Sequence, residues 1–368
     1  MTKRGVSLAV VAALLAAAML AVVVFFAVRK DEKQVTPTAE FRSPAVMITT
    51  ACIAAVEKPS AIKVLLCGEE SYEFQGLFET FGYICTRLGE SSESIRYDIV
   101  FVSGEASKAE LGHYAERLSE SGVLTWRLKV GAMTCGDFQR LFARFPCPSV
   151  HLWMPGSEEW VLVGRRQACK IKLEAMMELF ARESAFDLLA DAKAFALSDI
   201  FASYAGTRDD IEGAFADGAP KVKVRPEFFV TTKVPEIDWI TKSDVDDDIY
   251  RAVMREIRSM QVVRREILKG NIAVDQGRGD EALEIWMNAV KRNPRDPMMQ
   301  ERLGRLTLNA NALLRIGNAS AAAKCFESII VLDPLNASAV FEYGKCLQML
   351  GRKEQAQQVF KRAKELEK

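Results

Sequence analysis

Two stretches of sequence decide the fold of the C-terminal third of the chain: ANALLRIGNASAAAKCFESIIVLDP at residues 310–334 and GKCLQMLGRKEQAQQVFKRA at residues 344–363. In each stretch a small residue is followed 12 positions later by an alanine, and an aromatic residue stands four positions after that alanine. A third copy, GNIAVDQGRGDEALEIWMNAVKRNP, precedes them at residues 270–294. The two later copies are offset by 34 residues, from Ala322 to Ala356. Self-similarity at such a period predicts pairs of packed helices, in which the small residues let two helices approach closely.

This spacing resembles that of the tetratricopeptide repeat family, in which the aromatic residue fills the gap between two antiparallel helices. The resemblance implies helix pairs at about 263–294, 303–334 and 337–368. The first and second copies are 40 residues apart, so we expect six extra residues to lengthen the connection around residues 295–300. An ordinary helical bundle is the alternative, although a proline ends the second helix of the first two units.

In the tetratricopeptide family, ligand contacts come from a concave face that the first helices of the repeats form. The matching positions of this sequence carry polar residues: Arg264, Asn271, Thr307, Asn311, Arg315, Lys345 and Gln348. Residues 251–368 contain 21 basic and 14 acidic residues, so the predicted partner is a protein with an acidic peptide segment. The alternative is that these side chains only solvate helix faces. No aromatic residues are interleaved with the basic ones, which disfavours nucleic acid.

The N-terminal part contains one long apolar stretch, VSLAVVAALLAAAMLAVVVFFAV at residues 6–28, in which only Ser7 is polar. A helix of 23 residues is roughly 34 Å long, enough to span a hydrocarbon core of about 30 Å. We therefore expect a single-pass transmembrane helix; a cleaved secretory signal and a buried core helix are the alternatives. Basic residues flank the stretch on both sides, so they give little orientation bias. A short basic N-terminus in the cytoplasm would place the body outside a bacterial-type inner membrane.

After a polar linker at residues 29–43, residues 44–206 alternate between short β-rich runs and amphipathic stretches of helical length. This alternation predicts an α/β domain. KVLLC at residues 63–67 and DIVFVS at residues 98–103 are continuous apolar runs, typical of strands that a parallel sheet buries on both faces. SVHLW and EWVLVG follow each other too closely for a crossover, so these two strands must be antiparallel. We expect a mostly parallel sheet that ends in an antiparallel hairpin.

These strands, together with the strings YDIVFV, SGVLTWRL and FPCPSVHLWMPGSEEWVLVGRR, resemble the methyltransferase-fold domain of spermidine synthase-like proteins, particularly the membrane-fused bacterial kind. The resemblance continues through residues 170–206, which we expect to be helical, to KVRPEFF at residues 223–229. It implies a Rossmann-like sheet and an S-adenosyl ligand beside a glycine-rich turn after the first strand. It also implies a catalytic aspartate just after the fourth strand.

Both functional positions depart from the family pattern. The turn after the first strand reads GEESYE at residues 68–73, with one glycine and three carboxylates where the backbone must approach an anionic ligand. The place of the aspartate reads VSGEA at residues 102–106, so no carboxylate is positioned to accept a proton. We predict a degenerate, non-catalytic domain without a cofactor, marked by Gly68, Glu69 and Glu70. A divergent S-adenosylmethionine-dependent methyltransferase or polyamine aminopropyltransferase is the alternative.

Residues 207–250 form an acidic connector, with 6 basic and 11 acidic residues. DVDDD at residues 244–248 has the opening of a calcium loop, but Ile249 stands where that loop requires glycine. We expect Ser243 or Asp244 to cap a helix there instead. The eight cysteines form no C-x-x-C pair, and with only two histidines they indicate neither a metal site nor a disulfide framework.

The charges of the whole chain balance, with 49 basic and 49 acidic residues, which excludes a strongly basic nucleic-acid binder. The balance is a cancellation, because a net −2 over residues 1–206 and a net −5 over residues 207–250 oppose a net +7 over residues 251–368. Together the sequence predicts a membrane-anchored, non-catalytic interaction protein, in which a degenerate transferase-like domain carries a repeat module that binds a protein partner. A purely structural spacer is a further alternative.

Overall fold

The computed structural model describes the following parts of the chain: residues 62–80, 82–167, 170–180, 197–214, 221–230, 234–242, 245–294 and 296–367. All of these residues belong to one compact unit, which spans residues 39–368. The predicted membrane span at residues 6–28 lies outside the described residues. Among the helices that the structure does describe, none combines the length and the apolar character needed to cross a membrane.

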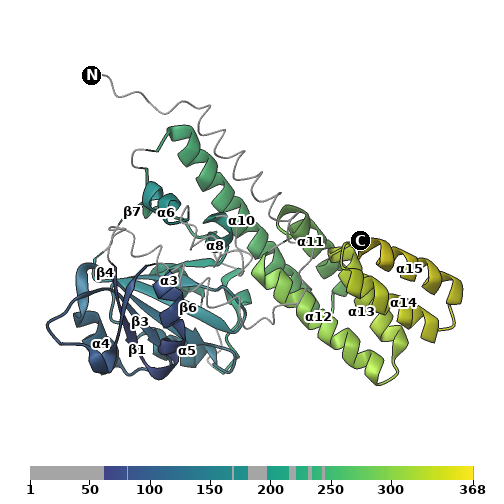
Figure 1. Cartoon of the computed structure of the whole chain (residues 1–368), viewed down its shortest axis with the longest axis horizontal. Coiled ribbons are helices and arrows are strands. Elements are labelled where there is room, and N and C mark those ends of the chain that lie inside the picture. Colours follow the sequence, from purple (N-terminus) through teal and green to yellow (C-terminus); the bar gives the residue numbers. More distant parts are fainter. Residues whose placement is uncertain are drawn as a thin grey trace. The chain divides into compact units, whose positions relative to one another are not determined.

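A seven-stranded sheet forms the centre of the α/β domain, with the strand order β2-β1-β3-β4-β6-β5-β8 (Figure 1). Its strands are β1 (Lys63–Cys67), β2 (Ile84–Arg87), β3 (Tyr97–Ser103), β4 (Leu118–Lys129), β5 (Ser149–Trp153), β6 (Glu159–Arg165) and β8 (Tyr204–Thr207). β1 pairs in parallel with β2 and β3, and β3 pairs in parallel with β4. β6 is antiparallel to both β4 and β5. The predicted parallel sheet with an antiparallel hairpin is therefore confirmed.

Short helical segments connect the strands of the sheet. They are η3 (Glu69–Phe74), α3 (Gln75–Thr80), η4 (Leu88–Glu90), α4 (Lys108–Glu116), α5 (Cys135–Phe142), α6 (Leu173–Phe180), α8 (Leu197–Phe201), α9 (Arg208–Ala214) and η5 (Pro226–Val230). α4 and α5 begin at capping boxes, in which the hydroxyls of Ser107 and Thr134 accept the backbone N–H three residues later. These caps satisfy backbone donors that the first turn of a helix leaves without partners.

The prediction of helix throughout residues 170–206 was wrong at both ends of that range. β7 (Ile171–Lys172) pairs with β9 (Ile240–Thr241), and β8 adds an antiparallel strand beside β5. Tyr204, the first residue of β8, is buried, and its hydroxyl lies 3.1 Å from Nδ1 of His151 and accepts a 3.3 Å hydrogen bond from the Trp239 indole. Burial of this tyrosine against β5 explains why the chain becomes extended there.

Six helices make up the C-terminal part of the chain: α10 (Asp247–Asp275), α11 (Gly279–Arg292), α12 (Pro297–Arg315), α13 (Ala319–Leu332), α14 (Ala337–Met349) and α15 (Lys353–Leu366). They form three successive pairs, joined within each pair by short turns (Figure 1). The expected helix pairing is confirmed. α10 is longer than expected, because its 29 residues begin within the acidic connector.

Two details of the helix boundaries differ from the expectation. Asp246, and not Ser243 or Asp244, caps α10 by accepting the N–H of Asp248 at 2.7 Å. The six extra residues of the first connection extend α12 instead of lengthening a loop, because Asp296 accepts the N–H of Met298 at 3.0 Å and starts the helix there. A proline at the first helical position and buried methionines after it favour this early start.

Each repeat packs an aromatic ring onto a small residue. A Cβ atom on Gly270 would lie 2.2 Å from Nε1 of Trp286, and one on Gly344 would lie 2.6 Å from Cε1 of Phe360. In the middle repeat the small residue is Ala310, which is completely buried. The aromatic rings therefore occupy the space that a larger side chain at the small position would need, as the repeat spacing predicts.

One continuous core joins a face of the sheet to the helical repeats. Trp160 of β6 makes edge-to-face contacts with Phe138 of α5 and Phe229 of η5, at centroid distances of 5.3 and 5.8 Å. Phe229 belongs to the same cluster of buried residues as Val263 of α10 and Met299 of α12. The opposite face of the sheet has its own cluster, to which α10 contributes Ile257. The α/β domain and the first repeat thus share buried apolar surface.

We predict that Gly344→Ala destabilises the chain by about 1–3 kcal/mol, because the added methyl group must displace the half-buried ring of Phe360. The matched control is Gly304→Ala in α12, where an added Cβ meets nothing within 4 Å. That change should stabilise the helix by roughly 0.5–1 kcal/mol. Urea unfolding followed by helical circular dichroism measures both, and equal effects of the two substitutions would contradict the packing account.

Candidate functional site

The first helices of the second and third repeats, α12 and α14, each expose a stripe of side chains. We call these side chains of the two helices the first-helix face: Leu308, Asn311, Arg315, Phe341, Lys345, Gln348 and Met349. Three of these residues are large and apolar, and Leu308, Phe341 and Met349 are 71%, 42% and 57% exposed. Residues three or four positions apart share one side of a helix, so each stripe is continuous along its helix.

Four of the residues predicted from the repeat pattern lie on this face. Arg315, Lys345 and Gln348 are exposed, and Asn311 is half-buried. The ammonium group of Lys345 pairs with Glu342 at 2.6 Å and lies 4.8 Å from the ring centroid of Phe341. The neighbouring Thr307 donates its hydroxyl to the carbonyl of Leu303 at 2.8 Å, within its own helix. The structure thus brings these predicted residues onto one side of α12 and α14.

Sequence reasoning missed the apolar members of the face. Leu308 stands next to Thr307, Phe341 stands one turn before Lys345, and Met349 follows Gln348. They occur at the helical spacing of the predicted polar residues, so the periodic pattern could have identified them.

Arg264, the predicted binding residue of the first repeat, is instead part of the interior. Its guanidinium is 4% exposed and donates from Nε to Oδ2 of Asp296, which is completely buried, at 2.9 Å. It also donates from Nη1 to the carbonyl of Met154 at 2.9 Å. Arg264 therefore connects α10, the start of α12 and the end of β5, and it has no exposed face to offer a partner.

Asn271 is also engaged within the chain. Its amide donates to Oε1 of Glu227 in η5 at 2.9 Å. One turn further along α10, Asp275 forms an ion pair with Arg225, just before η5. The residues before and within η5 therefore contact the side of α10 on which the repeat pattern predicted ligand contacts.

The turn between β5 and β6 contacts α12, the first helix of the second repeat, through further polar contacts. The backbone N–H of Ser157 donates to Oε2 of Glu301 at 3.0 Å, and its hydroxyl bonds to the other carboxylate oxygen. Arg305 of α12 pairs with Glu158 at 3.3 Å and with Glu301 at 2.7 Å. The start of α12 is thereby held against the α/β domain, whereas its later half carries the exposed residues Leu308 and Arg315.

We predict that Asp296→Ala lowers the free energy of unfolding by about 3–5 kcal/mol, because it leaves the buried charge of Arg264 without a partner. The double variant Arg264→Met with Asp296→Ala removes both charges and should be less destabilised than Asp296→Ala alone. Glu284→Ala, an exposed position on α11, serves as the matched control and should change stability by less than about 0.5 kcal/mol. Denaturant titration measures the free energy of unfolding of the three variants. A double variant as unstable as Asp296→Ala alone would contradict the claim that Asp296 stabilises the fold by compensating the buried charge of Arg264.

A second group of charged residues fills the carboxyl edge of β1, β3 and β4. Gly68 has a φ of 87°, and a Cβ there would lie 2.3 Å from the carbonyl oxygen of Ser103. Glu70 accepts hydrogen bonds from Lys129 at 2.9 Å and from the Ser103 hydroxyl at 3.4 Å. The hydrogen bond and charge of Lys129 lower the pKa of the Glu70 carboxyl below its usual value. Glu69 is exposed at the same turn.

Arg127 of β4 completes this edge network. It donates to the Ser103 hydroxyl at 3.3 Å, forms an ion pair with Glu159, and lies 3.7 Å from Glu70. Its guanidinium also lies 5.0 Å from the ring centroid of Phe74. Open α/β sheets bind ligands at this edge of the strands. In this chain, oppositely charged side chains bond to one another there.

Three of the cysteines are buried or half-buried thiols, and two aspartates of the acidic cluster in the connector form ion pairs. Cys67, Cys85 and Cys147 are unpaired thiols whose burial raises the pKa of each to about 12, which keeps them protonated and unreactive at neutral pH. In the acidic cluster, Asp247 pairs with Lys242 and Asp248 pairs with Arg251. Among the described residues, no three His, Cys, Asp or Glu side chains are grouped to hold a metal ion.

The geometry defines a chain in which helical hairpins follow an α/β sheet domain and share its core. A family model described as "Tetratricopeptide repeat" matches residues 267–308 and 307–367. The helices from the second half of α10 to α15 are therefore tetratricopeptide repeats, as the residue spacing predicted. The chain matches no curated protein at a significant level.

Proposed function

We propose that this chain is an interaction protein that binds an acidic, partly apolar segment of another protein through the first-helix face. Tetratricopeptide repeats generally bind protein partners, which supports this assignment. The observation that carries the proposal is the exposure of Leu308, Phe341 and Met349 beside basic side chains. Large exposed apolar side chains that gather on one surface mark interaction sites in soluble domains.

The charges on the face favour an acidic partner. Arg315 has no hydrogen bond or ion pair with the described residues, and its guanidinium is free to bind a carboxylate in a bidentate manner. Lys345 already pairs with Glu342, so it contributes less positive charge. We expect the apolar residues to provide most of the affinity and Arg315 to select acidic segments over basic ones.

The α/β domain is proposed to be a non-catalytic scaffold that resembles spermidine synthase-like domains. Its parallel strands and antiparallel hairpin agree with that resemblance. The network of Glu70, Arg127 and Lys129 lies at the edge where a nucleotide-type ligand would bind, which supports a loss of that activity. The scaffold would hold α10 and the start of α12, and leave α14 and the later half of α12 open to a partner.

Residues 6–28 are proposed to anchor the protein in a bacterial-type inner membrane as a single transmembrane helix, with the body on the extracytoplasmic side. The uninterrupted apolar sequence of this stretch supports the anchor. The sidedness rests on the short basic N-terminus before it. The partner would then belong to the cell envelope.

Charge reversal tests the proposed face. We predict that Arg315→Glu combined with Lys345→Glu lowers recovery of the partner by about tenfold or more when the full-length chain is captured from its own membrane extract. The matched control is Lys361→Glu, an exposed lysine on the second helix of the third repeat, which should leave recovery unchanged. Because the attraction is electrostatic, recovery should also fall as salt rises. Equal recovery by all variants would reject the face, and recovery of no partner would favour a structural spacer.

The second candidate function is a divergent S-adenosyl-dependent transferase. It is suggested by the open α/β sheet, because such sheets bind ligands at the carboxyl edge of their strands. We predict that neither S-adenosylmethionine nor its decarboxylated form binds more tightly than about 1 mM. Isothermal titration of the purified chain provides the measurement, with the Arg127→Ala variant as a comparison because it opens the edge network. Micromolar binding of either compound by the natural chain would contradict the non-catalytic proposal.

A further inference from the structure

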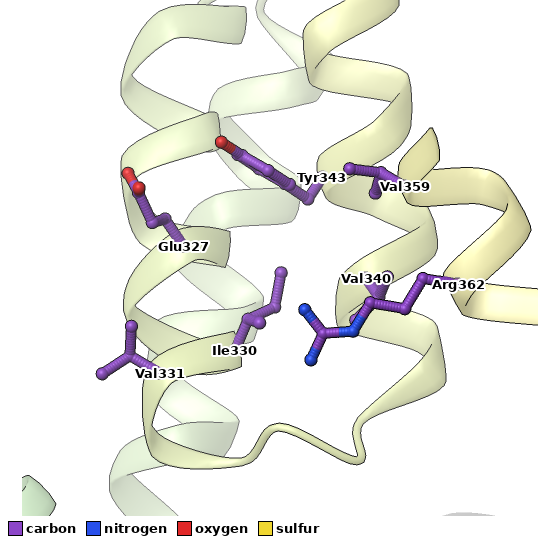
Figure 2. A pocket seen from close by; sticks show the side chains of 7 residues that line it. All are labelled: Glu327, Ile330, Val331, Val340, Tyr343, Val359 and Arg362. Carbon is purple, nitrogen blue, oxygen red and sulfur yellow. The ribbon is translucent and has the colours of Figure 1, made fainter. Parts of the chain in front are cut away.

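A separate pocket lies between α13, α14 and α15 (Figure 2). Its volume is about 250 Å³, and its lining comes from all three helices: Glu327, Ile330, Val331, Val340, Tyr343, Val359 and Arg362. Tyr343 and Val340 are the residues that α14 contributes, whereas Phe341, Lys345 and Gln348 of the same helix belong to the first-helix face. The two surfaces use different sides of α14 and share no residue.

The size of the pocket fits a single large side chain. Sites for small molecules and cofactors usually occupy about 300–1,000 Å³, and a cavity of about 150 Å³ already accommodates benzene. A volume of about 250 Å³ lies between these values. The pocket therefore accommodates a leucine, isoleucine or phenylalanine side chain of a partner better than it accommodates a nucleotide.

The floor of the pocket is aliphatic. Val340 is almost completely buried, Ile330 and Val359 are half-buried, and Val331 is 38% exposed. Figure 2 shows Ile330 of α13 facing Val340 of α14 across the space. An apolar side chain placed here would replace water next to four branched residues, which favours binding because apolar surface is removed from solvent.

Two opposite charges border this floor. Glu327 of α13 is exposed and has no hydrogen bond or ion pair with the described residues. Arg362 of α15 uses one donor on the carbonyl of Pro334, at 3.1 Å, and a guanidinium has further donors to offer. Pro334 follows the end of α13, so Arg362 lies near the C-terminal end of this helix. Glu327 lies five residues before the last residue of α13, which is roughly 7 Å away along the helix axis.

The hydroxyl of Tyr343 lies on the acidic side of the pocket. Figure 2 shows the hydroxyl of Tyr343 on the side of Glu327, and the guanidinium of Arg362 away from them, near Ile330 and Val340. Burial and the negative charge of Glu327 raise the pKa of Tyr343, so its hydroxyl stays protonated at neutral pH. The pocket thus has an apolar centre, an acidic end and a basic end.

We infer that this pocket is a second protein-docking site, which takes a bulky apolar side chain flanked by a basic residue on the Glu327 side and an acidic residue on the Arg362 side. The charge order makes the site directional, because a segment docked in reverse would place like charges together. Docking here leaves the first-helix face open, so one copy of the chain can hold two segments at once. The site is independent of the proposed function of that face.

Methyl NMR on the full-length chain, with labelled isoleucine and valine, tests this inference. The probes are three synthetic amphipathic peptides: one with a central leucine between a lysine and a glutamate, one with the two charges exchanged, and one with the leucine replaced by alanine. We expect the first peptide to shift the methyl signals of Ile330, Val331, Val340 and Val359. The other two peptides should bind at least about tenfold more weakly.

Matched variants separate this site from the first-helix face. The double variant Glu327→Lys with Arg362→Glu exchanges the charges at the rim and should reverse the preference between the first two peptides. Both residues are exposed, so the fold is expected to tolerate the exchange. Arg315→Glu should leave peptide binding at the pocket unchanged, even though it weakens capture of the partner by the first-helix face.

Three results would overturn the inference. The first is equal binding of all three peptides, and the second is an absence of shifts at the pocket methyl groups at a peptide concentration of about 1 mM. The third is a shift of the pocket signals with protein concentration in the absence of any peptide, which would assign the pocket to contacts between copies of this chain.

Discussion

The buried ion pair of Arg264 and Asp296 connects the first two repeats to the α/β domain. Arg264 belongs to the first helix of the first repeat, Asp296 caps the first helix of the second, and Met154 contributes its carbonyl from the end of a sheet strand. A charge so completely removed from water is tolerated only when its partners are fixed. The positions of α10, α12 and the β5–β6 turn are therefore mutually dependent.

This dependence explains why some first helices of the repeats are engaged within the chain and others are exposed. The contacts of Asn271 with Glu227 and of Asp275 with Arg225 join the first helix of the first repeat to the residues before and within η5. α14 and the later half of α12 remain exposed, and they carry Arg315 beside large apolar side chains.

Much of the fold follows from the sequence. The runs at residues 63–67 and 98–103 are strands because continuous apolar residues suit a sheet that is buried on both faces. The repeats follow from the close approach of aromatic rings to Gly270 and Gly344, which fixes the spacing of 12 and four residues. Both signals are local, so they can be identified without knowledge of the rest of the structure.

The errors concern residues whose state depends on distant partners. The guanidinium of Arg264 is buried because of Asp296 and a carbonyl 110 residues earlier, and no local pattern indicates this. Tyr204 lies in a strand because of His151 and Trp239, although its neighbours suggested a helix. Residues 297–300 are helical because Asp296 caps them, whereas the spacing of the repeats suggested a longer connection. The exposed apolar residues of the first-helix face were not among the predicted contact residues.

Hydrogen exchange of the full-length chain, with and without a protein partner captured by it, tests the central claim most directly. Slower exchange means that a surface is covered or that a helix opens less often. The proposed function predicts protection in the later half of α12 and in α14, with no change at residues 68–73 or at the β5–β6 turn. Protection confined to residues 68–73, with α12 and α14 unchanged, would contradict it and would return the sheet edge to consideration as the functional site.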